Sequence, residues 1–282
     1  MSSELIKTVR DWGIIGGALL VVGPIAGSIA GSLQTESGLE QASPLTSSSP
    51  VSGVLVGLIV IAIAIGYGVI AGRIAHARLG IMGAGLVLTW PAWQFGRVAD
   101  LVRDAGGLAP IRSFMAEGVI FGVACFAGVA FVLRFSRPVM PTESPESRSA
   151  KDMVFATGAS VIGAALGAWL IAQSSLQGQV YAAAVAAGIV GGAAGRSVAN
   201  RAPMLPILAG GLLLAVIGPL TARFGVSVDP LGRLYAGDWP GLALLTPFDW
   251  CAGILVGAPL GEMWANSMID RQSVQNPKPR TA

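Results

Sequence analysis

The sequence is poor in charged residues. Asp, Glu, Lys and Arg make up 12% of its 282 positions, whereas 53% are hydrophobic. A soluble domain carries about 25% charged residues, so this chain has too little charge to cover a water-exposed surface of its size. The shortage excludes a soluble cytosolic enzyme and a disordered chain, and it indicates a polytopic membrane protein.

Cysteine and histidine are almost absent. Cys125 and Cys251 both lie in apolar runs, which is typical of small buried side chains and not of a disulfide framework. His76 is the single histidine, which argues against haem and zinc sites and against Ser-His-Asp or Cys-His catalysis. We therefore expect no metal, no cofactor and no enzymatic activity. Basic patches interleaved with aromatics are also missing, so we expect no nucleic-acid partner.

Long apolar runs are frequent. A helix that crosses a bilayer needs about 20 mostly apolar residues. Continuous runs of this kind favour helices over the short alternating strands of a barrel. The sequence predicts an all-α integral membrane protein with eight transmembrane helices, at residues 13–34, 51–72, 79–96, 114–134, 153–173, 180–199, 204–223 and 246–265.

The positive charges set the orientation of these helices. With eight spans, 13 of the 18 Lys and Arg residues fall on the side of the N-terminus, and five fall on the other side. Cytoplasmic segments carry the excess of Lys and Arg in multi-pass proteins. We expect a protein of the cell (inner) membrane of bacterial type, with both termini in the cytoplasm.

The two halves of the chain resemble each other. The stretch 71–78 resembles 194–201, and further along 107–109 matches 241–243, with slowly drifting offsets. This order predicts a tandem duplication whose two units are parallel, because each contains an even number of spans. The expected parts are a first four-helix repeat at 1–135, a cytoplasmic polar linker at 136–152, a second repeat at 153–266 and a cytoplasmic polar tail at 267–282.

Glycine is abundant, with 39 residues. Gly23 and Gly27 in the first span, and Gly253, Gly257 and Gly261 in the last, recur at a spacing of four. This spacing places them on one helix face, where it predicts close helix packing in lipid. A ligand groove lined by glycine is the alternative.

Two carboxylates near the outer ends of the fourth helix of each repeat are candidates for function. Ionisable groups at membrane depth are rare and usually functional. In one hypothesis Glu117 and Asp249 bind a cation or carry protons along a pathway. In the other they lie at the interface, paired with Arg97, Arg112 or Arg223, or they complement helix N-termini.

A second set of charges lies toward the predicted cytoplasmic side. Arg73 and Arg78 recur in the second half as Arg196 and Arg201, and Glu262 lies near the inner end of the last span. The arginines are interpreted as topology signals or as ligands of anionic lipid headgroups.

The sequence leaves three functions open. The first is a transporter or permease of a small solute or ion, with a pathway between two pseudo-symmetric repeats. The second is a non-catalytic, membrane-embedded structural subunit of a larger complex. The third is an intramembrane enzyme that acts on lipid. The expected partners are the lipid bilayer and, in addition, other membrane subunits or further copies of the chain.

Overall fold

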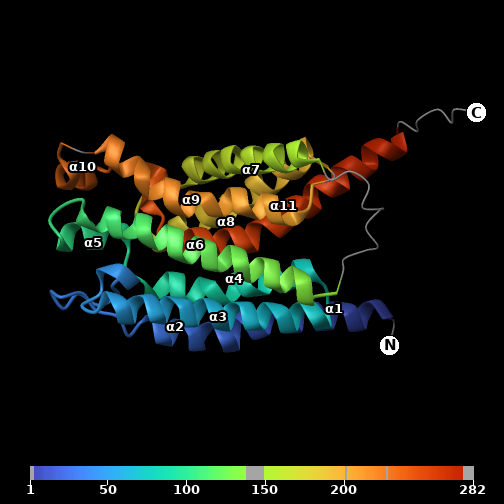
Figure 1. The fold of residues 1–282 in the computed structure, drawn as a ribbon, viewed down its shortest axis with the longest axis horizontal. Coiled ribbons are helices and arrows are strands. Elements are labelled where there is room, and N and C mark those ends of the chain that lie inside the picture. Colours follow the sequence, from blue (N-terminus) through green and yellow to red (C-terminus); the bar gives the residue numbers. More distant parts are fainter. Residues whose placement is uncertain (1–2, 138–148, 201, 227, 276–282) are drawn as a thin grey trace, which may run out of the picture.

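The protein is a bundle of long helices that lie roughly along one axis (Figure 1). The computed structural model describes residues 3–137, 149–200, 202–226 and 228–275. The first rod combines α1 (Ser3–Gly17), a π-helical turn η1 (Ala18–Val22) and α2 (Gly23–Ala30). The other long helices are α3 (Pro50–Ile74), α4 (Ala77–Gln94), α6 (Ala109–Phe135), α7 (Ala150–Ile171), α8 (Gln177–Val198), α9 (Met204–Gly225) and α11 (Pro247–Gln275). Short elements are η2 (Pro44–Thr46), α5 (Val98–Asp104), α10 (Pro230–Ala236) and η3 (Gly241–Leu244).

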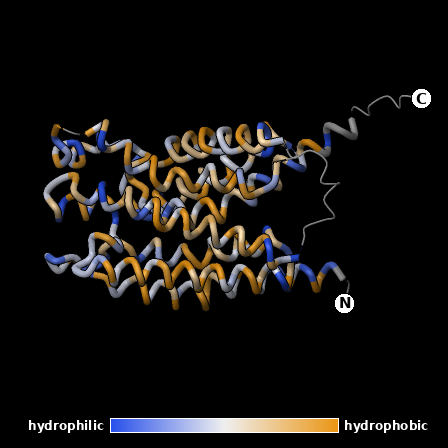
Figure 2. Tube along the Cα trace, viewed as in Figure 1, coloured by the Kyte–Doolittle hydropathy of each residue, from blue (hydrophilic) through white to orange (hydrophobic). Residues whose placement is uncertain are grey.

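Six of the helical rods are long and apolar enough to cross a membrane, namely Glu4–Ala30, Pro50–Ile74, Ala109–Phe135, Ala150–Ile171, Gln177–Val198 and Met204–Gly225. The prediction of an all-α membrane protein is confirmed by these rods. Helices α4 and α11 occupy the other two predicted ranges, but they are not among the six. Hydrophilic residues gather at the two ends of the bundle, and hydrophobic residues dominate its middle (Figure 2).

Helix α11 owes its lower apolarity to its central position. It packs against α8, α4, α9 and α6, and residues 247–259 are all buried. A helix shielded from lipid on most sides can carry polar groups that meet partners from neighbouring helices. For this reason α11 accommodates carboxylates that a lipid-facing helix excludes.

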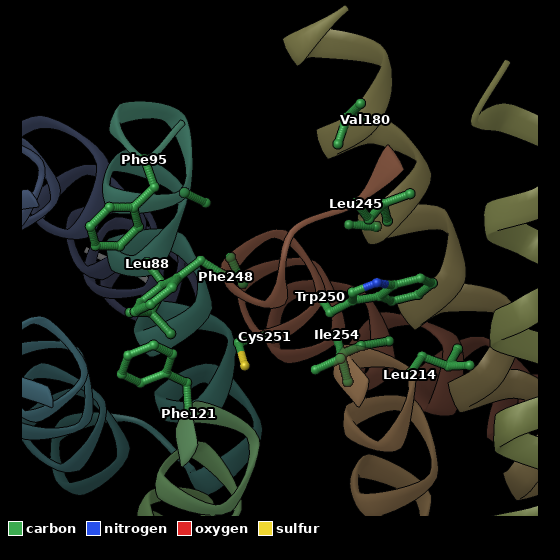
Figure 3. Packing of buried hydrophobic residues seen from close by; sticks show 14 of the residues in the cluster. Leu88, Phe95, Phe121, Val180, Leu214, Leu245, Phe248, Trp250, Cys251 and Ile254 are labelled. Atoms are coloured by element: carbon green, nitrogen blue, oxygen red, sulfur yellow. The ribbon is translucent and has the colours of Figure 1, made fainter. Parts of the chain in front are cut away.

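The two halves meet mainly where α4 packs against α11 and α6 packs against α9, with further contact between α6 and α11. Side chains fill this junction. The ring of Phe248 on α11 lies 4.5 Å from that of Phe95 and 4.8 Å from that of Phe121, measured between centroids (Figure 3). On another side of α11, the buried indole of Trp250 packs against α9, where a Cβ on Gly218 would lie 2.7 Å from its Nε1 (Figure 3). The middle of the bundle is therefore a packed aromatic and aliphatic core.

The glycine faces are confirmed as helix-packing surfaces. A Cβ added to Gly188 of α8 would lie 2.7 Å from the carbonyl oxygen of Gly253 and 2.8 Å from Cα of Gly257. In the first half, a Cβ on Gly27 would lie 3.0 Å from Cβ of Trp90 on α4. At Gly188 a Cβ would overlap the backbone of α11, and at Gly27 it would press on Trp90, so these glycines allow the observed close approach of the helices.

Both chain ends of the described bundle lie at the same end (Figure 1). The opposite end carries α5, α10 and the loop 31–49 (Figure 1). Of the predicted linker, residues 138–148 lie outside the described residues. The predicted tail begins inside α11, which continues to Gln275, and residues 276–282 again lie outside the described part.

Candidate functional site

Glu117 lies about two turns into α6, and its side chain is fully buried. Its Oε1 accepts a hydrogen bond from Ser43 Oγ at 2.8 Å and another from the backbone N–H of Leu45 at 2.6 Å. Its Oε2 has no hydrogen-bond partner among the described residues. Bonds to a carboxylate are shorter and stronger than bonds between neutral groups, so Glu117 fastens the loop 31–49 to α6.

The segment that Glu117 holds is a compact turn. Ser43 caps η2, with its N–H donating to Thr46 Oγ1 at 2.9 Å. Ser47 Oγ donates to the carbonyl oxygen of Pro44 at 2.8 Å. Gly53 of α3 allows the turn to fit, because a Cβ there would come 2.6 Å from Ser47 Oγ. The turn is therefore built into the end of the bundle that carries α5 and α10, with Ser43, Pro44 and Ser47 buried.

A hollow of about 550 Å³ lies beside this turn. Its lining includes Leu45, Thr46, Ser47 and Ser113, together with the acidic Asp104. Ser113 precedes Glu117 by one helical turn, which places both on one face of α6. Glu117 itself does not line the hollow, since the turn 43–47 lies at the hollow's edge and covers the carboxylate.

Asp249, in the first turn of α11, is also buried, and its Oδ1 has no hydrogen-bond partner among the described residues, but its other oxygen has different partners. Its Oδ2 accepts hydrogen bonds from the N–H of Thr246 at 2.8 Å and from Thr246 Oγ1 at 2.7 Å. In return the N–H of Asp249 donates to Thr246 Oγ1 at 3.2 Å. This reciprocal pattern is a capping box, which satisfies the free N–H groups at a helix start. Asp249 therefore stabilises the first turn of α11, with Thr246 as its N-cap residue.

The structure does not connect the two carboxylates by a hydrogen bond within the described residues, and it does not pair them with the expected arginines. Arg97 instead bonds Asp100, at 2.6 Å. Arg112 and Arg223 have exposed side chains. Hydroxyl and backbone N–H groups, and not these arginines, therefore contact the two carboxylates.

A second buried polar cluster lies toward the other end of the bundle. Glu262 on α11 is 2% exposed and forms ion pairs with Arg78 of α4 and Arg196 of α8. Arg196 also donates to the carbonyl oxygens of Asn200 at 2.7 Å and Ala202 at 2.9 Å. Two of the four repeated arginines therefore bind one carboxylate. The signal that sequence reasoning missed was that Glu262 and these arginines carry opposite charges at the same predicted depth.

The other repeated arginines are less engaged. Arg73 donates from Nε to the carbonyl oxygen of Phe135 at 3.2 Å, and its guanidinium carbon lies 5.7 Å from the centroid of the same ring. This contact ties the end of α3 to the end of α6. Arg201 lies outside the described residues. A role of these arginines in topology stays a prediction.

The long apolar helices make this chain a multi-pass membrane protein. Comparisons with protein-family models, with curated proteins and with solved structures found no match.

Proposed function

We propose that the chain is a transporter or permease of a small solute or ion, and that Glu117 is the acidic group on its pathway. One observation carries this proposal: Glu117 is fully buried beneath a turn that lines the hollow, and one of its two oxygens has no partner in the described structure. Asp249 Oδ1 is also buried without a partner there, but the other oxygen of Asp249 caps its own helix, and neither Asp249 nor Thr246 lines the hollow. A buried, incompletely satisfied carboxylate is costly. Such groups within membrane-spanning segments belong to ion and proton pathways. A proton or a small cation is the ligand that fits a single unpartnered carboxylate oxygen. Under this proposal the chain is not an enzyme.

The pathway is proposed to run between two parallel four-helix repeats. The packing supports this arrangement, because the third helix of each predicted unit contacts the fourth helix of the other, as α4 with α11 and α9 with α6. The short helices in corresponding loops also meet, with the guanidinium carbon of Arg103 on α5 lying 5.3 Å from the ring centroid of Tyr235 on α10. Both pairings are what a two-fold axis along the bundle produces.

Eight spans are proposed for the same bundle. Exposed tryptophans support α4 and α11 as the two spans beyond the six apolar rods. Trp90 and Trp93 lie near the end of α4, and Trp264 lies past the buried part of α11. Tryptophan is enriched at both membrane interfaces.

The charge bias supports both termini in the cytoplasm of a cell with an inner membrane. Ser48→Cys should react with a membrane-impermeant thiol reagent in intact cells, whereas Ser267→Cys should react only after permeabilisation. Both side chains are exposed in the structure. The reverse pattern would overturn the orientation.

A flux assay tests the transport proposal. The purified protein in liposomes should carry a current under an imposed proton, Na⁺ or K⁺ gradient. Glu117→Gln removes the charge with little change of shape and should reduce that flux strongly, by about tenfold or more, as expected when an intramembrane charge is lost. Asp249→Asn is the matched control, because its carboxylate caps a helix. No flux of any of the three ions by the unmodified protein would overturn the proposal.

A structural subunit is the second candidate, and one surface favours it. Ala62 and Gly66 lie on the exposed face of α3 at a spacing of four, and space is open where a Cβ on Gly66 would point. Small residues at this spacing accept a partner helix in lipid. Purification in mild detergent should then yield a stoichiometric partner or a dimer that Gly66→Leu abolishes and Ile70→Leu retains. A monomer in mild detergent would count against this candidate.

A further inference from the structure

Two side-chain attachments fasten the loop 31–49 to the bundle, in addition to the packing of its turn 43–47 against α3 at Gly53. Near its middle, Ser37 Oγ donates a hydrogen bond to Asp104 Oδ1 at 2.6 Å. Further along, Ser43 and Leu45 donate to Glu117. The second attachment lies inside the protein, since Ser43 is 1% exposed. The turn 43–47 is therefore drawn into the bundle by one carboxylate oxygen.

The backbone between these attachments is strained. Gln41 has a φ of 66°, and it is the single non-glycine residue with positive φ in the described parts of the chain. Residues with a side chain avoid this region because Cβ crowds the backbone. The carbonyl oxygen of Gln41 also lies so close to Gly96 that a Cβ there would overlap it. The strain sits two residues before the attachment of Ser43 to Glu117.

The attachment to Glu117 is itself incomplete. Oε1 takes both hydrogen bonds, and Oε2 takes none from the described residues. A buried acceptor without a donor raises the free energy of the closed arrangement. The strain at Gln41 and the unpaired oxygen thus act in the same direction, since both lower the free energy needed to lift the turn.

The hollow of about 550 Å³ lies beside the turn. Leu45, Thr46 and Ser47 belong to its lining, and Ser113 continues the lining one helical turn before Glu117. Moving these few residues would join the hollow to the carboxylate, without a rearrangement of the long helices.

We propose that residues 41–47 form a lid over Glu117, latched by its carboxylate and strained at Gln41. This inference rests on the proposed function, because it specifies how the acidic group becomes accessible from the end of the bundle that carries α5 and α10. Transient lifting of the strained turn exposes Glu117, and uptake of a proton or cation then keeps the lid open, since the donors Ser43 and Leu45 lose their charged acceptor.

A buried thiol next to the latch reports on the opening. Ala42 is fully buried, so Ala42→Cys should react only when the lid lifts. The reporter is placed in a Cys125→Ala, Cys251→Ala background in lipid nanodiscs, and its reaction rate with a water-soluble maleimide is measured. When Glu117→Gln is combined with the Ala42→Cys reporter, the rate of maleimide labelling should rise about tenfold. The reason is that hydrogen bonds to a charged acceptor are roughly twice as strong as neutral ones. Gln41→Gly should lower the rate severalfold, because glycine adopts positive φ without strain.

Two controls make the result decisive. Asp249→Asn should leave the rate unchanged, since it neutralises a buried carboxylate that does not touch the turn. Val129→Cys places a second reporter in the core of α6, where Val129 is fully buried, and it should stay unreactive in every variant if the bundle is intact. Equal rates for Glu117→Gln and Asp249→Asn, or no slowing by Gln41→Gly, would overturn the lid. The expected labelling pattern without any ion flux would retain the lid and overturn transport.

Discussion

Arg78 Nε lies 3.3 Å from Glu262 Oε2, and this contact joins the first turn of α4 to α11 across 184 positions of the chain. Arg196 of α8 binds the other oxygen of the same carboxylate. One acidic side chain thus ties the first half of the protein to two helices of the second, at the end of the bundle opposite the proposed lid.

Glu262→Gln should destabilise the fold by about 3–5 kcal/mol, because it leaves the guanidinium group of Arg196 buried without a countercharge. The measurement is the unfolding midpoint in mild detergent with increasing SDS. Arg78→Gln is the matched control: the side chain of Arg78 is 24% exposed, and its loss should cost only about 1 kcal/mol, as for partly solvated pairs. Equal losses would contradict this assignment.

Thr246→Val and Asp249→Asn should each lower the free energy of unfolding by about 1 kcal/mol, the usual cost of removing a helix cap. Because both residues act in one capping box, the double variant should cost less than the sum of the two. Neither substitution should change ion flux. Loss of flux in Asp249→Asn alone would return this carboxylate to the proposed pathway.

Gly257→Ala should destabilise the protein by about 1–3 kcal/mol, as overpacking does. A Cβ on Gly257 would lie 2.7 Å from the N atom of Ile189 and 2.9 Å from Cα of Gly188. Gly158→Ala offers a comparison on α7, where a Cβ meets no atom within 4 Å, and it should be neutral or slightly stabilising through helix propensity. Thermal unfolding in detergent distinguishes the two; similar midpoints would refute the packing argument.

His76 should make stability depend on pH. Burial lowers the pKa of His76 from its ordinary value of 6.5, and the nearby guanidinium groups of Arg78 and Arg10 lower it further, whereas Asp11 opposes them. As the pH falls below 6.5, the unfolded chain takes up the proton first, so stability declines until the pH reaches the lower pKa of the folded state.

The control for this prediction preserves the helix cap. His76 Nδ1 accepts the N–H of Leu79 at 3.2 Å at the start of α4. His76→Asn keeps an N-cap acceptor without a titrating ring. Thermal midpoints measured between about pH 5 and 8, where histidine titrates, should fall with acidification more steeply in the unmodified protein than in the variant. Parallel curves would exclude His76 as the cause.

Apolar runs predicted the long helices well, because hydrophobic length is a local property of the chain. The central place of α11 was not predictable in the same way, since a helix buried on most sides lacks the polar stripe that reveals its orientation. Its capping box, however, was visible in the sequence. Thr246 and Asp249 have the spacing of that motif, but the prediction considered only the charge of Asp249 and missed the cap.

The burial of Glu117 followed from its position in an apolar run, but its partners did not. Ser43 and Leu45 lie 74 and 72 positions away, in a polar loop with no hydrophobic signal to indicate that it folds into the bundle. The shared use of Glu262 by Arg78 and Arg196 was hidden for a related reason, because pairing between distant helices depends on how the helices are arranged and not on any one segment.

The central position of α11 has a consequence for biosynthesis. Translation delivers α11 after all the other described helices, yet it contacts α4, α6, α8 and α9. Until it enters the membrane, the glycine face of α8 has no partner, and Arg78 and Arg196 lack their carboxylate. We therefore expect the nascent bundle to close around its centre only when α11 inserts.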